Sequence, residues 1–168
     1  MHSSTMDSRM NKLVARVLRA FLGVLVTLPL YVAAQERAQA DFVVYKNAQC
    51  MCCDVWVEHM QAAGYTLDLQ VTQTMDAVKA EHGLGPRLQS CHTAVHRESG
   101  LVFEGHIPAR HVTALIEAPE PGAKGLTVPG MPIGSPGMEM GSRKDPYNVL
   151  LLSEGGKVSL YARENAPQ

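Results

Sequence analysis

Three cysteines occupy four successive positions in Cys50–Cys53 (CMCC), directly after a short apolar run. That run, Asp41–Tyr45 (DFVVY), is β-branched and aromatic, which predicts a buried strand. Beyond the cysteines, apolar residues recur at helical spacing as far as Gly64, where a C-terminal helix cap is expected. A strand, a thiol cluster and a helix therefore follow one another directly, which places the thiols at the N-terminus of a helix.

Residues 1–40 carry the pattern of a secretory signal. Four basic residues within 9–19 precede fifteen uncharged, mostly apolar residues, and small residues follow. The apolar run is shorter than the roughly 20 residues that a membrane-spanning helix needs. We expect cleavage after Ala34 or Ala40, which leaves 41–168 as the mature domain. An uncleaved membrane anchor is the alternative.

Export determines which partners and which thiol chemistry are expected. Residues 41–168 hold 10 basic and 14 acidic residues, a net charge of −4. This part has no basic patch suited to nucleic acid, so neither nucleic acid nor, after signal cleavage, a membrane is an expected partner. All four cysteines lie in it, and an exported compartment oxidises free thiols. The cysteines are therefore expected to be paired, metal-bound or redox-active.

The rest of the chain alternates between strand and helix patterns. Strand patterns occur at 65–71, 93–96, 101–104, 147–152 and 157–162. Helical patterns occur at 74–82 and 108–118. Residues 108–146 hold seven of the ten prolines, and we expect 119–146 to be one long loop rich in Pro, Gly and Met. The order predicts an α/β sandwich with a mixed sheet and a C-terminal β-hairpin.

The third cysteine distinguishes between two kinds of chemistry. Cys50 and Cys53 have the C-x-x-C spacing of a disulfide-exchanging pair, and a helix N-terminus favours the thiolate that redox chemistry and metal binding both need. Cys52 adds a thiol that disulfide exchange does not need. Neighbouring side chains point in different directions, so Cys52 and Cys53 suit two adjacent ions better than one. We favour a polynuclear, thiolate-bridged metal site; a buried disulfide with a spare thiol is the alternative.

Other soft ligands lie at the ends of predicted strands. Cys91 begins a strand that can pair with the first one, which would bring it near Cys50. His92 and His106 also lie at strand ends, and we predict both as ligands. The long loop contains three methionines, of which Met138 is the candidate ligand, with surface packing as the alternative explanation.

The set of donors favours copper over other metals. Zinc would be satisfied by three cysteines and one histidine, so it is the less favoured alternative. Iron–sulfur proteins use cysteine spacings that do not match C-x-C-C. Thiolate, imidazole and thioether together select copper, and this cluster predicts more than one ion.

Four motifs together resemble the CopG family of exported copper-resistance proteins. They are Cys50–Trp56 (CMCCDVW), Ser90–Thr93 (SCHT), Glu104–Pro108 (EGHIP) and Pro129–Met138 (PGMPIGSPGM). The resemblance covers about residues 42–163. It implies a thioredoxin-like fold, a periplasmic location, a multi-copper cluster and interconversion of Cu(I) and Cu(II).

The resemblance transfers ligand roles to individual residues. It implies Cys50, Cys52, Cys53 and Cys91 as the core ligands, followed by His92, His106 and Met138. Thioredoxins carry a cis-proline at the start of the third strand, where this chain has Ser90–His92 instead. That difference favours metal binding over disulfide exchange.

The sequence therefore predicts a periplasmic copper-binding protein for copper resistance, whose partners are metal ions and other periplasmic copper-resistance proteins. Two alternatives stay open. One is a periplasmic thiol-disulfide oxidoreductase that uses Cys50 and Cys53. The other is a zinc-stabilised structural module, which would unfold on chelation.

Overall fold

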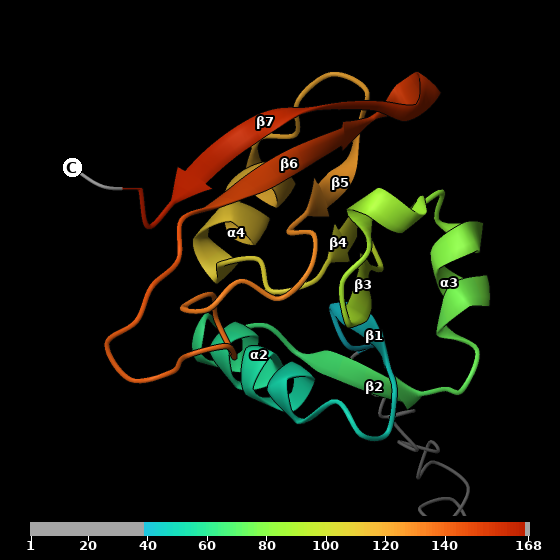
Figure 1. Ribbon diagram of the computed structural model, residues 1–168. Coiled ribbons are helices and arrows are strands. Elements are labelled where there is room, and N and C mark those ends of the chain that lie inside the picture. Colours follow the sequence, from blue (N-terminus) through green and yellow to red (C-terminus); the bar gives the residue numbers. More distant parts are fainter. Residues whose placement is uncertain (1–38, 167–168) are drawn as a thin grey trace, which may run out of the picture. The chain divides into compact units, whose positions relative to one another are not determined.

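The computed structural model describes residues 39–166 (Figure 1). The predicted signal peptide, apart from its last two residues, lies outside the described residues. None of the helices in 39–166 combines the length and the hydropathy that crossing a bilayer requires.

The described residues form seven strands, three α-helices and two short 3₁₀ turns. The strands are β1 (Phe42–Lys46), β2 (Leu67–Val71), β3 (His92–His96), β4 (Val102–Glu104), β5 (Ala123–Thr127), β6 (Tyr147–Ser153) and β7 (Lys157–Glu164). The helices are α2 (Met51–Ala62), α3 (Met75–Glu81) and α4 (Ala109–Glu117). The 3₁₀ turns are η1 (Pro86–Leu88) and η2 (Glu154–Gly156).

All seven strands join one sheet in the order β2-β1-β3-β4-β5-β6-β7. The pairs β1–β2 and β4–β5 are parallel, and the other neighbours are antiparallel. The predicted α/β class with a mixed sheet is confirmed. The last two strands form the expected hairpin, in which Tyr147 pairs with Glu164 and Ser153 with Lys157.

One prediction about the long loop is wrong, because strand β5 lies within 119–146. Its sequence, AKGLT, contains a lysine and a glycine, so it lacks the apolar alternation of a strand. Gly125 is required there: a Cβ atom at this position would lie 1.7 Å from the carbonyl oxygen of Val102 on β4. The edges of β4 and β6 stabilise the strand, and a neighbouring edge is not visible in the local sequence.

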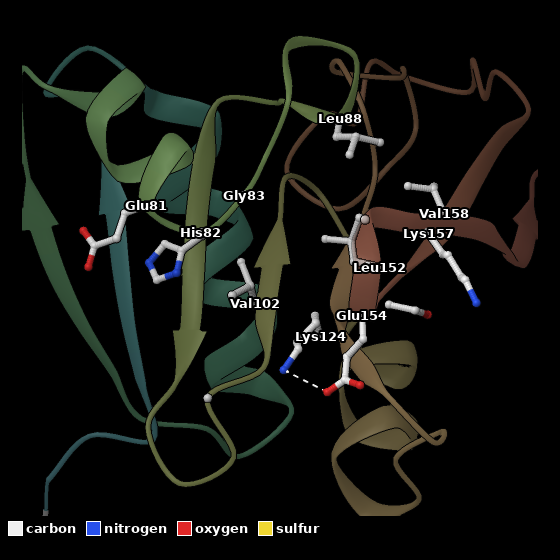
Figure 2. Close-up of a pocket in the computed structure, with 14 residues that line it drawn as sticks. Glu81, His82, Gly83, Leu88, Val102, Lys124, Leu152, Glu154, Lys157 and Val158 are labelled. Atoms are coloured by element: carbon white, nitrogen blue, oxygen red, sulfur yellow. Dashed lines mark ion pairs between the residues drawn. The ribbon is translucent and has the colours of Figure 1, made fainter.

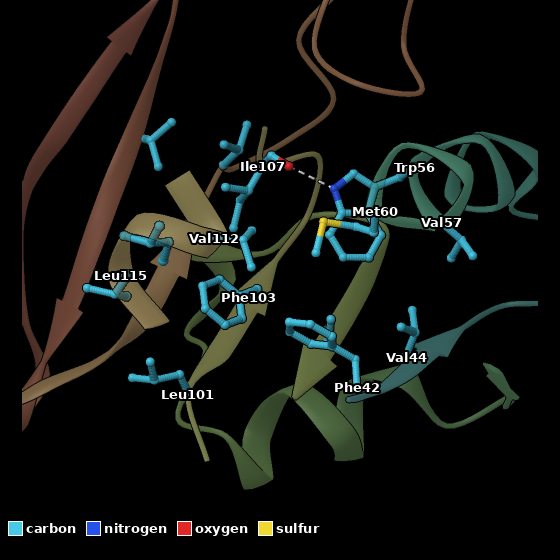
Figure 3. Packing of buried hydrophobic residues seen from close by; sticks show 14 of the residues in the cluster. Phe42, Val44, Trp56, Val57, Met60, Leu101, Phe103, Ile107, Val112 and Leu115 are labelled. Carbon is cyan, nitrogen blue, oxygen red and sulfur yellow. Dashed lines mark hydrogen bonds between the residues drawn. The ribbon is translucent and has the colours of Figure 1, made fainter. Parts of the chain in front are cut away.

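The core lies on the face of the sheet that α2 and α4 cover (Figure 3). Trp56 and Met60 of α2 pack there with Phe42 of β1 and Phe103 of β4, and all four are fully buried. Trp56 also donates a hydrogen bond from Nε1 to the carbonyl oxygen of Ile107, at 2.9 Å. This bond connects α2 to the segment that follows β4.

The opposite face carries α3 and a cavity of about 460 Å³ (Figure 2). Val102 and Leu152 line the cavity, and Lys124 and Glu154 form an ion pair beside it at 3.4 Å. None of the cysteines and none of the predicted histidine ligands line it. The cavity is therefore separate from the candidate site described next.

Candidate metal centre

Three strand ends meet beside the N-terminus of α2. Strands β1 and β3 are antiparallel, and their register pairs Lys46, the last residue of β1, with His92, the first of β3. Strand β4 runs back along β3 and ends at Glu104, opposite Thr93. The C-x-C-C segment, Cys91 and His106 therefore come together at one end of the sheet.

The four cysteines form one sulfur cluster at this end. Their Sγ atoms all lie within 4.8 Å of one another. Cys50 and Cys53 form a disulfide with Cα atoms 5.4 Å apart, while Cys52 and Cys91 are free thiols. The Sγ atom of Cys52 lies 3.5 Å from that of Cys50 and 3.9 Å from that of Cys91. The disulfide matches one of the alternatives that the sequence left open.

His106 presents a lone pair to the sulfur cluster. Its Nδ1 atom lies 2.8 Å from the carbonyl oxygen of Pro136, and a carbonyl can only accept, so Nδ1 carries the proton. In the neutral ring, Nε2 is then an acceptor, and it lies 2.9 Å from Sγ of Cys91. A partner on the far nitrogen that fixes the tautomer is typical of metal-binding histidines.

His92 is fully buried beside the same sulfur. Its Nδ1 atom lies 3.7 Å from Sγ of Cys91, and its ring packs between those of Trp56 and His106 at centroid distances of 4.4 Å and 5.0 Å. Its Nε2 atom has no hydrogen-bond partner within the described residues. Cys91, His92 and His106 thus form a second donor group that shares Cys91 with the cysteine cluster.

The proline-rich loop packs directly on this site. A Cβ atom at Gly137 would lie 2.5 Å from the carbonyl oxygen of Cys52 and 2.9 Å from the backbone nitrogen of Trp56. Gly137 also has a φ of +85°, which a side chain disfavours. Only glycine therefore lets the loop contact the first turn of α2 this closely.

The three loop methionines differ in exposure. Met131 and Met140 are exposed, at 53% and 61%. Met138 is half-buried and lies within a turn in which its backbone N–H donates to Ser135 and its carbonyl accepts from Gly134. This turn includes Gly137, which contacts α2, so Met138 lies one residue from the site. A ligand role for Met138 stays a prediction.

Comparison with known proteins identifies the family. Residues 88–138 match a family described as a protein of unknown function, DUF411. Two solved structures of copper resistance protein CopG, forms 2 and 1, each match with 40% sequence identity and a TM-score of 0.69. The match covers 73% of this chain and 96% of the form 2 chain, and 74% and 97% for form 1. This chain belongs to the CopG family.

No curated protein matches the chain. The DUF411 match includes Cys91, His92, His106 and Met138. It begins at residue 88 and therefore does not include the C-x-C-C segment, which lies N-terminal to it. The CopG relationship and the clustered Cys and His side chains make this a candidate metal centre suited to copper.

Burial affects the protonation of the donors in this CopG-family site. Burial lowers the pKa of His92 well below its ordinary value of 6.5, and the neighbouring His106 and Lys79 lower it further. Burial also lowers the pKa of His106, against the opposing effect of its hydrogen bond to Pro136. Both imidazoles are therefore neutral at neutral pH, which is the form that binds metals.

The pKa of the free thiol of Cys91 shifts in the opposite direction. Burial raises the pKa of Cys91 to about 12, and the neighbouring Cys52 raises it too. Without a metal, Cys91 is therefore a protonated thiol that donates to Nε2 of His106. A soft cation that displaces this proton gains a thiolate and an imidazole together.

Two buried lysines support the site, and no local sequence pattern indicates either of them. Lys46 forms an ion pair with Asp54 and donates to the carbonyl oxygen of Cys50 at 3.2 Å, which secures the first turn of α2. Lys79 of α3 forms an ion pair with the fully buried Glu104. The sequence includes Glu104 in the EGHIP motif, but a lysine in a helix pattern ordinarily indicates the exposed side.

Glu104 also positions the backbone before Cys91. It accepts hydrogen bonds from the backbone N–H of Ser90 at 2.6 Å and from the Thr93 hydroxyl at 2.6 Å. Gly105 permits this packing, because a Cβ atom there would lie 2.5 Å from the Ser90 side chain. The three residues of the EGH sequence therefore provide a buried carboxylate, a glycine that lets the backbone pack against Ser90, and a candidate ligand.

The structure brings six of the seven predicted ligands into the two donor groups, namely Cys50, Cys52, Cys53, Cys91, His92 and His106. Their roles as ligands stay predictions. His59, which the sequence left without a role, pairs with Glu139 at 2.8 Å and connects α2 to the proline-rich loop.

Proposed function

We propose that the exported domain, residues 41–168, is a periplasmic copper-binding protein for copper resistance. It is exported by the signal in 1–40, with cleavage after Ala34 or Ala40, and it holds several copper ions as cargo. The observation that carries this proposal is the cluster of four sulfurs within 4.8 Å of one another. Such density of thiolates suits Cu(I).

In the reduced form, Cys50, Cys52, Cys53 and Cys91 bind a polynuclear Cu(I) cluster. The spacing supports shared ions: two thiolates on one roughly tetrahedral ion, each about 2.3 Å from it, lie about 3.8 Å apart. The Sγ atoms of Cys52 and Cys91 are 3.9 Å apart. His106 adds a nitrogen through Nε2, His92 adds a second nitrogen, and the imidazoles also accommodate Cu(II).

The remaining parts of the proposal concern the scaffold and the loop. A thioredoxin-like frame is supported by the order β2-β1-β3-β4, with β3 antiparallel to β1 and the cysteines at the N-terminus of the first helix after β1. The loop that carries Met138 covers the site, and Met138 supplies a thioether to the copper. Other periplasmic copper-resistance proteins exchange copper with this chain.

Anaerobic titration of the reduced protein with Cu(I), followed by elemental analysis, tests copper binding. More than one tightly bound copper ion is expected, with a large loss in Cys52→Ser and Cys91→Ser. His82→Asn is the matched control, because His82 lies outside both donor groups. Zero stoichiometry, or full copper binding by Cys52→Ser, contradicts the proposal. A single redox-silent zinc in protein purified without added metal would favour the zinc-stabilised alternative.

A second candidate function is disulfide exchange, which the Cys50–Cys53 disulfide specifically favours. A thiol-disulfide oxidoreductase reduces insulin without metal and does not depend on Cys52 or Cys91. Metal-free insulin reduction that persists in Cys52→Ser would favour this function over copper binding.

A further inference from the structure

A carboxylate that makes two bonds attaches the proline-rich loop to α2. Oε1 of Glu139 lies 2.8 Å from Nε2 of His59 on α2, and Oε2 accepts the backbone N–H of Gly137 at 2.9 Å. Figure 1 shows the loop between β5 and β6 reaching this helix. Glu139 therefore joins the second half of α2 to the turn that packs against the carbonyl oxygen of Cys52.

The loop makes a tight turn where it packs on the helix. The backbone N–H of Met138 donates to the carbonyl oxygen of Ser135 at 2.8 Å, and Pro136 and Gly137 occupy the two central positions. Proline followed by a glycine with a φ of +85° is typical of a type II turn. Type I and type II turns differ in the orientation of the peptide unit between the two central residues. The turn type therefore sets the direction of the Pro136 carbonyl.

Both polar groups of that central peptide unit are bonded. Its N–H, on Gly137, donates to Glu139 at 2.9 Å, and its carbonyl, on Pro136, accepts from Nδ1 of His106 at 2.8 Å. The peptide is trans, so its N–H and C=O point in opposite directions within one rigid plane. The carboxylate on one side therefore orients the carbonyl on the other, and a chain of hydrogen bonds runs from Glu139 to His106.

The proton on Nδ1 decides what His106 can bind. In the neutral ring the other nitrogen, Nε2, keeps its lone pair, and it lies 2.9 Å from Sγ of Cys91. A neutral histidine in water favours the opposite tautomer, with the proton on Nε2. The nitrogen that faces the sulfur cluster can therefore bind a metal only while the Pro136 carbonyl holds the proton on the far side of the ring.

We propose that Glu139 is a positioning residue for the copper site and that His59 secures it to α2. Glu139 orients the Pro136 carbonyl, the carbonyl keeps the proton on Nδ1 of His106, and Nε2 is left to bind Cu(I). This inference rests on the proposed function, in which His106 is a copper ligand. Glu139 acts through the loop backbone and does not itself bind copper.

Glu139 contributes little to the stability of the fold. Its side chain is 49% exposed and that of His59 is 45% exposed, and ion pairs this exposed add little to stability. Loss of the carboxylate should therefore change the site more than it changes the fold. Asp145 is the matched control, because it is a carboxylate of the same loop whose side-chain bonds within the described residues go to Arg143 alone.

The tautomer of His106 can be read directly in the metal-free protein. Histidine is labelled with ¹⁵N, the cysteines are kept reduced, and long-range proton–nitrogen correlation spectra at neutral pH distinguish protonated from unprotonated ring nitrogens. The His106 signals are those that disappear in His106→Gln. The spectra are compared for Glu139→Ala, Glu139→Gln, His59→Ala and the control Asp145→Ala. Competition with a Cu(I) chelator then measures the copper affinity of each variant.

In the unaltered protein, Nδ1 of His106 should be protonated and Nε2 unprotonated. Glu139→Ala should move much of the proton to Nε2 and lower the Cu(I) affinity by roughly three- to tenfold, the effect of losing one typical hydrogen bond. Asp145→Ala should change neither the tautomer nor the affinity.

Two further variants separate positioning from a general structural effect. Glu139→Gln should retain the native tautomer, because an amide can accept from Gly137 and donate to His59. His59→Ala should shift the tautomer less than Glu139→Ala does. It should add no shift when residue 139 is already alanine, because the two side chains act through one bond.

Three outcomes overturn the inference. They are a His106 proton that stays on Nδ1 in Glu139→Ala, a shift in Asp145→Ala as large as that in Glu139→Ala, and a shifted tautomer with unchanged Cu(I) affinity. The tautomer is read without copper, so this failure is distinct from failure of the proposed function. Absence of Cu(I) binding by the unaltered protein rejects the proposed function, whereas intact binding with an unmoved tautomer in Glu139→Ala rejects only the inference.

Discussion

Two clusters of buried polar side chains lie on opposite faces of the same two strands, and they differ in how well their polar atoms are satisfied. On the α3 face, Lys79, Thr93 and Glu104 bond to one another, and Glu104 also accepts the N–H of Ser90. On the α2 face, His92 is just as buried, yet its Nε2 is the one buried side-chain nitrogen or oxygen in residues 39–166 without a partner.

Adjacent residues contribute to the two clusters because side chains alternate across a strand. Thr93 faces α3 and the neighbouring His92 faces Trp56 of α2. A satisfied cluster stabilises the scaffold, whereas unsatisfied soft donors have free energy to gain from a ligand. The same two strands therefore carry structural support on one face and a binding site on the other.

The largest expected effect comes from breaking the satisfied cluster. Replacing Glu104 by Ala leaves Lys79 buried without a counter-ion, so we expect the free energy of unfolding to fall by about 3–5 kcal/mol. Urea denaturation of the reduced, metal-free protein measures this loss.

Glu154 provides the matched control for that prediction. Its ion pair with Lys124 is exposed, so Glu154→Ala should change the free energy of unfolding by less than about 1 kcal/mol. A double variant, Lys79→Met with Glu104→Leu, should recover the part of the loss that comes from the unpaired Lys79 charge, but not the part that comes from the bonds of Ser90 and Thr93 to Glu104. Equal losses in Glu104→Ala and Glu154→Ala would mean that the buried cluster on the α3 face stabilises the fold no more than an exposed ion pair does.

The next effect is a pH dependence of the free energy of unfolding, and it originates in the unsatisfied cluster on the α2 face. The folded protein keeps His92 and His106 neutral because their pKa values lie below the ordinary 6.5, while the unfolded chain protonates them. The unfolded state thus binds more protons below pH 6.5, and stability falls with acidification. Each histidine contributes a slope of up to about 1.4 kcal/mol per pH unit.

Urea denaturation of the metal-free protein between pH 7.5 and 5 measures that slope. The loss should be visible above the range in which carboxylates titrate, and His106→Gln should reduce it. A free energy of unfolding that is constant from pH 7 to pH 5 would contradict the assignment of neutral histidines.

A smaller effect is expected where the loop contacts the site. Gly137→Ala places a Cβ atom against the carbonyl oxygen of Cys52, whereas the same change at Gly130 meets nothing within 4 Å. Both glycines have positive φ, so both variants share a conformational cost of about 1 kcal/mol. Only Gly137→Ala should also displace the loop and speed copper release, measured by transfer of Cu(I) to a chelator. Equal release rates in the two variants would mean that the loop does not cover the copper.

The smallest stability effect is expected at His92 itself. His92→Leu removes a buried nitrogen that has no partner, so the free energy of unfolding at pH 7.5 should change by less than about 1 kcal/mol. Copper affinity, measured by competition with a Cu(I) chelator, should nevertheless fall if His92 is a ligand. A large stability loss with unchanged copper affinity would make His92 a structural residue.

Local patterns predicted most of the fold, but not all of it. Strand β1, the helix after the cysteines and the final hairpin have strong periodicity and clear caps, so they could be recognised from neighbouring residues alone. Strand β5 could not, because Gly125 and Lys124 suit it only beside β4 and β6. Lys79 and Glu104 were missed as a pair for the same reason: they are 25 residues apart, and no local pattern connects them.

By itself, the sequence determined which donor atoms this protein has and where the chain places them: thiols at a helix start and histidines at strand ends. These are local properties, set by residue identity and short-range periodicity. Only the tertiary structure decided which donors meet, which tautomer His106 adopts and which of the four sulfurs pair. Those outcomes depend on the antiparallel register of β1, β3 and β4 and on the contact of Gly137 with α2, both of which join residues far apart in the chain.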